Sequence, residues 1–287
     1  MKRLIVTADD FGLSTAVNEA VELAHTTGIL TAASLIVTAP AATDAIERAR
    51  RLPTLGVGLH LVFVDGIPAL PPAQIPDLVG ADGRFQKNPT SFGVRLFFSR
   101  RIQRQLAAEM RAQFELFRAT GLALDHVNGH HHFHQHPTIV GMLIALAREV
   151  RINAVRVPHE PFGPSHRAQR DHFWRRWLGG VFPITRLTGM RARLRAAGVA
   201  SNEHLFGLHD SGRMTAARIS RYLDELPDGV SELYSHPATA RWTGPDNLPA
   251  TYLCIEEYAA LADPRLRARL EHAGIERISF SALASPV

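Results

Sequence analysis

Short apolar runs alternate with longer amphipathic segments from end to end of the chain, and this alternation restricts the fold more than any other feature. Several runs lack a regular polar alternation, which is typical of parallel strands covered on both faces. The predicted strands are Arg3–Ala8, Ala32–Val37, Leu55–Leu61, Ala123–Val127, Ala154–Val157, His204–Leu208, Ser231–Tyr234 and Arg277–Phe280. The pattern favours an α/β fold, a distorted (β/α) TIM-like barrel forming a single domain over residues 1–287, above a doubly wound open sheet.

Capping residues mark helices between these runs. Ser14 is expected to cap a helix over Thr15–Thr27 that ends at Gly28, and Asp263 followed by Pro264 predicts the start of the last helix. Further helices are predicted at 41–51, 100–120 and 137 to about 150. Two insertions, at about 63–93 and 158–200, interrupt the alternation. The first is rich in Pro and Gly and too long for a simple connection, so we expect a lid or substrate-binding loop.

The composition is that of a globular enzyme, with 46% hydrophobic and 21% charged residues. No apolar run approaches the roughly 20 residues that span a bilayer. Cys254 is the only cysteine, so neither a disulfide framework nor a thiolate zinc site is expected. A reducing, cytoplasmic location is therefore predicted.

Arginines gather between Ser165 and Gly198, where eight of them are opposed only by Asp171 and are interleaved with Phe and Trp. A nucleic-acid partner is not predicted, because no nucleic-acid motif accompanies them. The simplest interpretation is a solvated helix face. The alternatives are peripheral contact with an anionic membrane, at its inner face, or contact with a second subunit in a homodimer.

Two adjacent carboxylates, Asp9 and Asp10, follow the first predicted strand. Active sites of parallel α/β folds are built at this C-terminal strand edge. Adjacent residues there point in different directions, so one carboxylate could bind metal while the other faces a water. The plainer alternative is a turn that begins a helix. His60 lies near the end of the third predicted strand, at the same edge. A single histidine there is a weak signal, but the potential ligands at the other strand ends make a metal-binding role more plausible.

Six of the fifteen histidines lie between Leu122 and Pro137, a density typical of metal binding or proton transfer. If the segment is extended, one side carries Asn128, His130, His132, His134 and His136, and His131 faces the other way. His130 is the expected metal ligand, and His132 is expected to touch the substrate or support the ligands. His134 and His136 are expected to be structural or peripheral.

Two later residues complete the candidate site. His236 follows the seventh predicted strand and would suit a general acid for an amine leaving group, although a histidine before a turn proline needs no function. Arg156 ends the fifth predicted strand, where it could orient the substrate or the catalytic Asp, or simply form an ion pair.

Taken together, A-D-D-F-G, G-L-H-L, H-V-N-G-H-H-H-F-H, R-V-P and S-H-P resemble the YdjC-like carbohydrate deacetylases, in family order over almost the whole chain. The resemblance implies a distorted (β/α) barrel that removes N-acetyl groups from amino sugars such as chito-oligosaccharides. It also implies a divalent metal, Mg²⁺ in preference to Zn²⁺, bound by Asp10, His60 and His130. Asp9 would be the general base and His236 the acid.

The motif N-G-H-H-H-F-H-Q-H-P resembles that of the hopanoid-biosynthesis-associated branch of the family, HpnK. This resemblance implies an N-acetylglucosaminyl hopanoid glycolipid as substrate. Two positions depart from the family pattern. Asn128 stands where Asp is usual, which affects the substrate site or the support of the metal ligands, and Ala238 stands where Gly is usual. Arg156, His132 and Asn128 are the predicted substrate-binding residues.

Two other functions compete with deacetylation. A metal-dependent phosphoesterase would usually need a second ion held by further carboxylates, and few are available at the strand ends. A non-catalytic lipid- or metal-binding protein would not need Asp9 beside a metal ligand.

Overall fold

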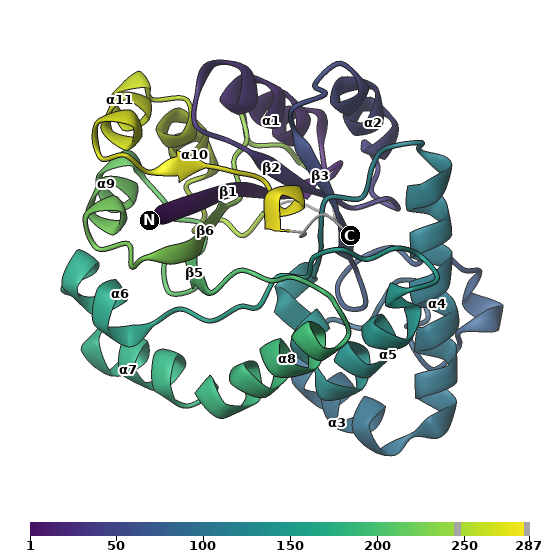
Figure 1. The fold of residues 1–287 in the computed structure, drawn as a ribbon. Helices are drawn as coiled ribbons and strands as arrows, with labels where there is room; N and C mark the ends of the chain where they lie inside the picture. The colour runs from purple at the N-terminus through teal and green to yellow at the C-terminus, as the bar shows by residue number, and fades with distance from the viewer. Residues whose placement is uncertain (244–247, 284–287) are drawn as a thin grey trace.

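The computed structural model describes residues 1–243 and 248–283, in which the chain forms an α/β fold around one curled parallel sheet (Figure 1). The strands are β1 (Lys2–Phe11), β2 (Ala32–Leu35), β3 (Gly56–Leu61), β4 (Val127–Gly129), β5 (His204–Phe206), β6 (Gly229–Ser235) and β7 (Glu276–Arg277). Their order is β4-β3-β2-β1-β6-β5, and β7 pairs with β1. All these pairings are parallel, so the C-terminal strand ends meet at one edge.

The central strand is β1, which pairs with β6 on one side and β2 on the other. Leu4, Val6 and Ala8 face the main hydrophobic core, whereas Ile5 belongs to a second, smaller cluster. Both faces of the strand are therefore covered, which explains why its sequence is a continuous apolar run.

Helices surround the sheet, and the capping residues mark their ends as predicted. They are α1 (Thr15–Thr27), α2 (Ala42–Arg50), α3 (Pro89–Phe98), α4 (Arg100–Ala119), α5 (Pro137–Ala147), α6 (Phe162–Gln169), α7 (Phe173–Val181), α8 (Ile184–Ala196), α9 (Ala216–Asp224), α10 (Cys254–Leu261) and α11 (Pro264–His272). The Ser14 side chain accepts a hydrogen bond from the Val17 amide, and Asp263 accepts one from the Arg265 amide. These two predicted helix starts are confirmed.

The α/β class and the curled parallel sheet are confirmed, but a complete TIM barrel is not. Between β4 and β5 the predicted strand at Ala154–Val157 makes only isolated bridges, Val127 with Val155 and Ala154 with Ala200. The predicted last strand is also shortened, because a 3₁₀ turn, η3 (Phe280–Leu283), follows the two residues of β7. The sheet thus closes irregularly on the side where α6, α7 and α8 lie in Figure 1.

Helices occupy much of the second predicted insertion, whereas the first is mostly turns and irregular chain. The first contains a 3₁₀ turn, η1 (Pro72–Gln74), and runs into α3, whereas the interval 158–200 forms α6, α7 and α8. In that interval Arg176 is fully buried against Asp171 and Asp210, so this arginine is a structural member of the core. None of the helices in the described parts of the chain is long and apolar enough to span a bilayer.

Candidate active site

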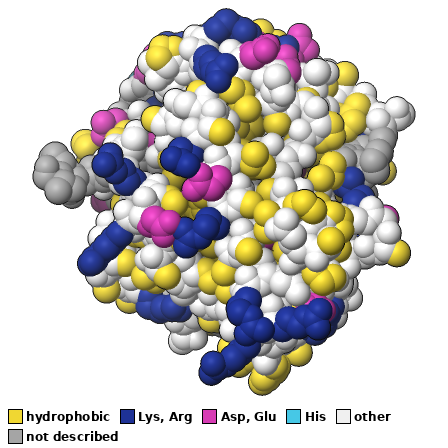
Figure 2. All heavy atoms as spheres, turned by 90° about the vertical axis from the view of Figure 1, so that its right-hand side faces the viewer, with side chains coloured by type: hydrophobic (Ala, Val, Ile, Leu, Met, Phe, Trp, Pro, Cys, Tyr) yellow, Lys and Arg dark blue, Asp and Glu magenta, His cyan; other side chains and the backbone are white. Residues whose placement is uncertain are grey.

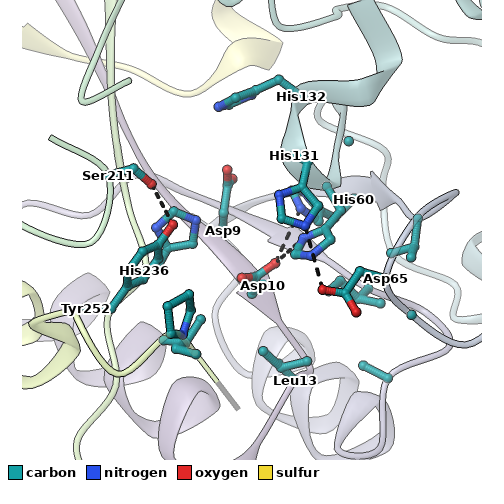
Figure 3. Close-up of a pocket in the computed structure, with 18 of the residues that line it drawn as sticks. Asp9, Asp10, Leu13, His60, Asp65, His131, His132, Ser211, His236 and Tyr252 are labelled. Carbon is teal, nitrogen blue, oxygen red and sulfur yellow. Dashed lines mark hydrogen bonds and ion pairs between the residues drawn. The ribbon is translucent and has the colours of Figure 1, made fainter. Parts of the chain in front are cut away.

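A pocket of about 510 Å³ opens at the C-terminal edge of the sheet (Figure 3). It is lined on one side by Asp10 and His60 and on the other by Ser211, Tyr252 and His236, with Asp9 between the two groups. His130 lines the same pocket next to Asp10 and His60. Residues from β1, β3, β6 and the segments after them meet there because the sheet is parallel.

Both carboxylates at the end of β1 line this pocket, although neighbours in a regular strand point to opposite faces. The strand is irregular here: its register against β2 shifts between Ala8 and Phe11, and Asp10 has a φ of 64°. Such a conformation is uncommon for residues other than glycine, and residues that adopt it cluster at functional sites. This local bulge brings Asp9 and Asp10 to the same cavity.

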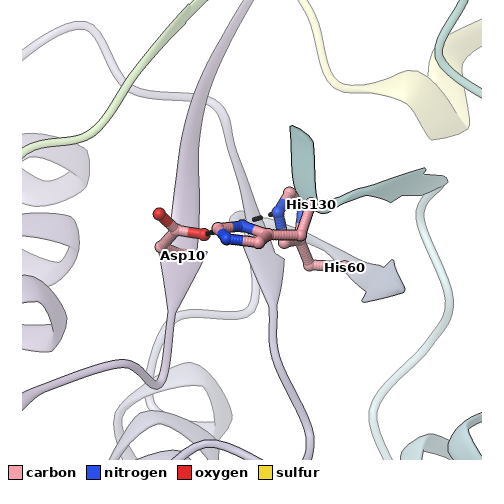
Figure 4. A group of neighbouring side chains, drawn as sticks. All are labelled: Asp10, His60 and His130. Atoms are coloured by element: carbon pink, nitrogen blue, oxygen red, sulfur yellow. Dashed lines mark hydrogen bonds and ion pairs between the residues drawn. The ribbon is translucent and has the colours of Figure 1, made fainter. Parts of the chain in front are cut away.

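Asp10, His60 and His130 form a compact group whose ligand atoms all lie within 4.8 Å of one another (Figure 4). The Asp10 Oδ1 atom is 3.1 Å from His130 Nδ1 and 3.4 Å from His60 Nε2. Burial would raise the pKa of Asp10, but His130, His236 and His60 hold it below the ordinary value. The group thus presents an ionised carboxylate between two imidazoles.

The His60 ring has the right tautomer for a ligand. Its Nδ1 atom lies 2.7 Å from the Asn128 Oδ1 atom, an acceptor, so Nδ1 carries the proton. Burial lowers the pKa of His60 to about 4, so the ring is neutral near pH 7 and Nε2 has a free lone pair. Nε2 is buried without a hydrogen-bond partner among the described residues. The His60 Nε2 lone pair and the Asp10 Oδ1 atom face each other, and a cation between them would stabilise this arrangement. Two imidazoles with one carboxylate suit a divalent metal.

The histidine-rich segment is not extended, and that prediction is wrong. Residues His130–Gln135 form a 3₁₀ turn, η2, in which His131 and His132 have φ values of 52° and 53°. The turn brings His130, His131 and His132 to the pocket, although the sequence placed His131 on the opposite side. A break in alternation caused by positive φ values at non-glycine residues has no clear sequence signal.

His134 and His136, expected to be structural or peripheral, make contacts within the protein. The His134 ring is buried, and its Nε2 atom lies 2.9 Å from the Arg156 carbonyl oxygen. His136 precedes α5 and its side chain accepts a hydrogen bond from the Thr138 amide. Both side chains therefore hold η2 against its surroundings.

Asp9 is held by a buried charged cluster beneath the pocket. The Arg156 guanidinium donates to both Asp9 oxygens, at 2.6 and 3.0 Å, and to Glu232 at 2.6 Å. Asn128 Nδ2 donates to Asp9 Oδ1 at 3.1 Å. Burial would raise the pKa of Asp9, but Arg156 holds it well below the ordinary value of 3.8, with smaller contributions from His60 and His236. The carboxylate is thus ionised and fixed in direction.

Arg156 and Asn128 do not support the predicted substrate contact. Both are fully buried, and neither lines the pocket in the described structure, because their polar groups are taken up by Asp9, Glu232 and His60. His132 does line the pocket, with its ring edge-on to Tyr234 at 5.1 Å. The geometry therefore gives Arg156 the other role expected for it, orientation of Asp9.

His236 lies across the pocket from the metal-ligand group (Figure 3). Its backbone amide donates to the buried Glu257 carboxylate at 2.6 Å, and its ring packs against Tyr252 with centroids 5.1 Å apart. The Nδ1 atom is buried without a hydrogen-bond partner among the described residues. The ring is positioned by its backbone and by packing, which leaves its nitrogens for a ligand.

Several pocket residues were missed by sequence reasoning. Asp65, Ser211 and Tyr252 line the cavity, and Glu232 holds Arg156 from below. Asp65 and His131 lie at the rim of the pocket, with Asp65 Oδ2 3.9 Å from His131 Nε2. A single polar residue in a loop carries no signal until the fold brings it to the strand ends, so only Glu232, an acid inside an apolar strand, could have been noticed.

The chain is similar to known proteins in sequence and in fold. Residues 3–272 match the profile of the family described as YdjC-like protein. A carbohydrate deacetylase of Geobacillus stearothermophilus is 31% identical over 279 residues, which cover 96% of each chain. One from Brevibacillus brevis is 38% identical over 156 residues, 54% of this chain and 59% of the relative. A crystal structure from Enterococcus faecalis V583, described as a candidate cellobiose-phosphate cleavage protein, superposes with a TM-score of 0.74 at 25% identity over 99% of both chains.

Proposed function

The chain belongs to the YdjC-like protein family, and from this premise we propose that it is a metal-dependent carbohydrate N-deacetylase. The observation that carries the proposal is the group Asp10, His60 and His130 in one pocket with Asp9 and His236. Relatives named carbohydrate deacetylases support the reaction class, and the tautomer of His60 supports the metal.

Asp10, His60 and His130 would hold the ion, with Mg²⁺ favoured and Zn²⁺ as the alternative. When bound, a divalent ion supplies Lewis acidity, which polarises the acetyl carbonyl and makes water more acidic. The family resemblance supports Mg²⁺, whereas two imidazole ligands are equally compatible with Zn²⁺.

Asp9 would act as the general base. Its Oδ2 atom accepts one hydrogen bond from Arg156, which leaves a second lone pair for a proton taken from the attacking water. Arg156 and Asn128 fix the carboxylate so that this lone pair keeps its direction. Preorganisation of this kind lowers the cost of reaching the reacting geometry. Arg156 is thus a positioning residue.

His236 would protonate the departing amine. It lies on the side of Asp9 opposite the metal ligands, so that a substrate amide could fit between the ligand group and the imidazole (Figure 3). Amines leave poorly without a proton, and an acid positioned in this way typically contributes 10²- to 10⁴-fold in rate. His132, Asp65 and His131 line the pocket and would contact the sugar.

For the substrate we propose an N-acetylglucosaminyl glycolipid of the hopanoid type, with soluble chito-oligosaccharides as the alternative. Support comes from the N-G-H-H-H-F-H-Q-H-P motif and from aromatic side chains on the outside of α7 and directly after it, among them Trp174 and Phe182, which are 70% and 86% exposed. Phe97 and Phe98 are likewise exposed on α3. Figure 2 shows hydrophobic side chains interspersed with Lys and Arg on the face that includes α3 and α4.

Exposed aromatic groups beside arginines suit the headgroup region of an anionic bilayer. We accordingly propose that the enzyme works in the cytoplasm at the inner face of the membrane, with α7 and α8 towards the lipid. A homodimer formed through the same helices is the alternative, and sedimentation of the free protein would detect it.

Acetate release tests the function. Metal-stripped protein is supplied with single divalent ions and then with N-acetylglucosaminyl glycolipid or chito-oligosaccharide. Metal-dependent acetate from the glycolipid alone supports the full proposal, and release from both substrates restricts it to carbohydrate deacetylation. No acetate from folded, metal-loaded protein would contradict it and favour a phosphoesterase or a binding protein.

A further inference from the structure

A continuous line of buried hydrogen bonds runs from the C-terminal 3₁₀ turn to the proposed metal site. Asp125 accepts from the backbone amide of Ser281 at 2.8 Å, and its other oxygen is 2.9 Å from His126 Nδ1. His126 Nε2 is 3.0 Å from Ser34 Oγ, and Asn128 Nδ2 is 2.8 Å from the same Oγ. Asn128 Oδ1 then reaches His60 Nδ1. We call Asp125, His126 and Ser34 the support chain.

The direction of every donor along this line follows from its two ends. Both Asp9 oxygens accept hydrogen bonds from the Arg156 guanidinium, so the Asn128 group facing Asp9 is its NH₂, and the Asn128 oxygen faces His60. The second N–H of Asn128 points to Ser34 Oγ, whose own hydrogen is then free for His126 Nε2. His126 Nδ1 therefore carries a proton and donates to Asp125. All members are satisfied only if each donates towards Asp125.

Two glycines of strand β3 leave space for the Asp125 and His126 side chains. A Cβ atom at Gly58 would lie 2.4 Å from the His126 ring, and one at Gly56 would lie 2.7 Å from the Asp125 carboxyl group. Gly56, Gly58 and His60 alternate along the strand and so share one face. The His126 ring is also stacked on Phe280, with centroids 4.4 Å apart. The two glycines of the G-V-G-L-H sequence thus leave space for the Asp125 and His126 side chains, which lie outside the pocket lining. The last residue of this sequence is the proposed ligand His60.

We infer that the support chain positions the metal site: Asp125, His126 and Ser34 hold the Asn128 amide in one orientation, which keeps the proton of His60 on Nδ1 and its Nε2 lone pair towards Asp10. This inference rests on the proposed metal site and adds residues that touch neither metal nor substrate. Outer partners of this kind typically change metal affinity 10- to 100-fold when removed.

The first test reads the tautomer directly in the metal-free wild-type protein. Nitrogen-15 NMR of the histidine rings distinguishes a protonated Nδ1 from a protonated Nε2. We expect His60 to carry its proton on Nδ1 near pH 7 before any metal is added. A proton on Nε2 would overturn the inference, irrespective of the Zn²⁺ affinities of the Ser34 and His126 variants.

The second test is Zn²⁺ affinity by calorimetry for Ser34→Ala, His126→Phe and a matched control, Ser231→Ala. Ser231 is also a buried strand serine, but its Oγ has no hydrogen-bond partner among the described residues. Phe keeps the ring that stacks on Phe280 and removes both nitrogens. We expect about tenfold or greater loss of Zn²⁺ affinity for Ser34→Ala and His126→Phe.

The control variant should bind Zn²⁺ as the wild type does. The double variant Ser34→Ala/His126→Phe should lose little more than either single variant, because both interrupt one line. Equal affinities in Ser34→Ala and Ser231→Ala would overturn the inference. Neither readout involves deacetylation, so a protein that releases no acetate would refute the proposed function and leave the support chain to be decided by Zn²⁺ binding.

Discussion

The floor of the pocket and the outer face of α7 and α8 use arginine in opposite ways. Arg156 under the pocket is fully buried, and its donors go to Asp9 and Glu232. Arg175 on α7 is exposed beside the exposed Trp174. A buried ion pair costs desolvation and is tolerated where it fixes a geometry, whereas an exposed charge costs little and remains free for other partners. The comparison separates residues that build the reaction site from residues that could bring it to a surface.

Removal of the proposed ligand carboxylate should give the largest effect. Asp10→Ala leaves two imidazoles without the central anion, so we expect loss of tight metal binding and a fall in acetate release of about 10³-fold or more, since Lewis-acid stabilisation amounts to several kcal/mol. Metal content and acetate release measure both. Asp65→Ala, which removes an exposed rim carboxylate, should keep the metal, and an equal loss of bound metal in the two variants would contradict the ligand assignment.

The variant Asp9→Asn distinguishes the proposed general base from the proposed metal ligands. We expect metal to remain bound while turnover falls by about 10²- to 10⁴-fold, the usual contribution of a general base. Zn²⁺ calorimetry and acetate release on the same preparation make the comparison, with circular dichroism to show that the protein is folded. Turnover near the wild-type rate would refute the role of Asp9.

Arginine substitution should distinguish the two regions by stability. Arg156→Leu leaves Asp9 and Glu232 buried without their cation, and we expect about 3–5 kcal/mol loss in the free energy of unfolding by urea at pH 7. Arg175→Leu on the exposed face should change it by no more than about 0.5 kcal/mol. Similar values for both would show that the cluster is not a stability element.

The same pair of variants has a defined pH dependence. The pKa of Asp9 is lowered in the folded protein, so its ion pair contributes stability above its ordinary pKa of 3.8 and loses that contribution as the pH falls further. Without Arg156, burial raises the pKa of the same carboxyl in the variant, so the difference in unfolding free energy between wild type and Arg156→Leu should be largest at neutral pH and shrink as the pH falls. A difference that grows in acid would contradict the assignment.

Substitutions on the outer face should have the smallest effect on chemistry. Trp174→Ser/Phe182→Ser should weaken co-sedimentation with anionic vesicles at low salt and leave acetate release from a soluble chito-oligosaccharide unchanged, because neither residue lines the pocket. Wild-type protein that fails to bind the vesicles at all would contradict the membrane proposal. Binding that survives both substitutions would assign it to another surface.

Much of the fold and part of the site could be predicted because the signals are local. Apolar runs, Ser14 and Asp263 mark strands and helix starts through interactions within a few residues. Asp10, His60 and His130 follow strand ends, and parallel strands necessarily bring such ends together. The irregular segment at Ala154–Val157 could not be predicted, because its strand-like composition does not reveal which neighbours it pairs with.

What the sequence determined by itself, then, is the α/β class, the helix caps and the set of polar groups at one sheet edge, since each depends on periodicity or on residue type. Only the tertiary structure decided which of those groups share the pocket. The positive φ values of Asp10, His131 and His132 redirect side chains that regular strands would have separated. Burial converts Arg156 and Asn128 from expected substrate contacts into supports for Asp9 and His60, because their hydrogen bonds are completed inside the protein. These outcomes depend on contacts between distant segments, and local sequence preferences do not encode them.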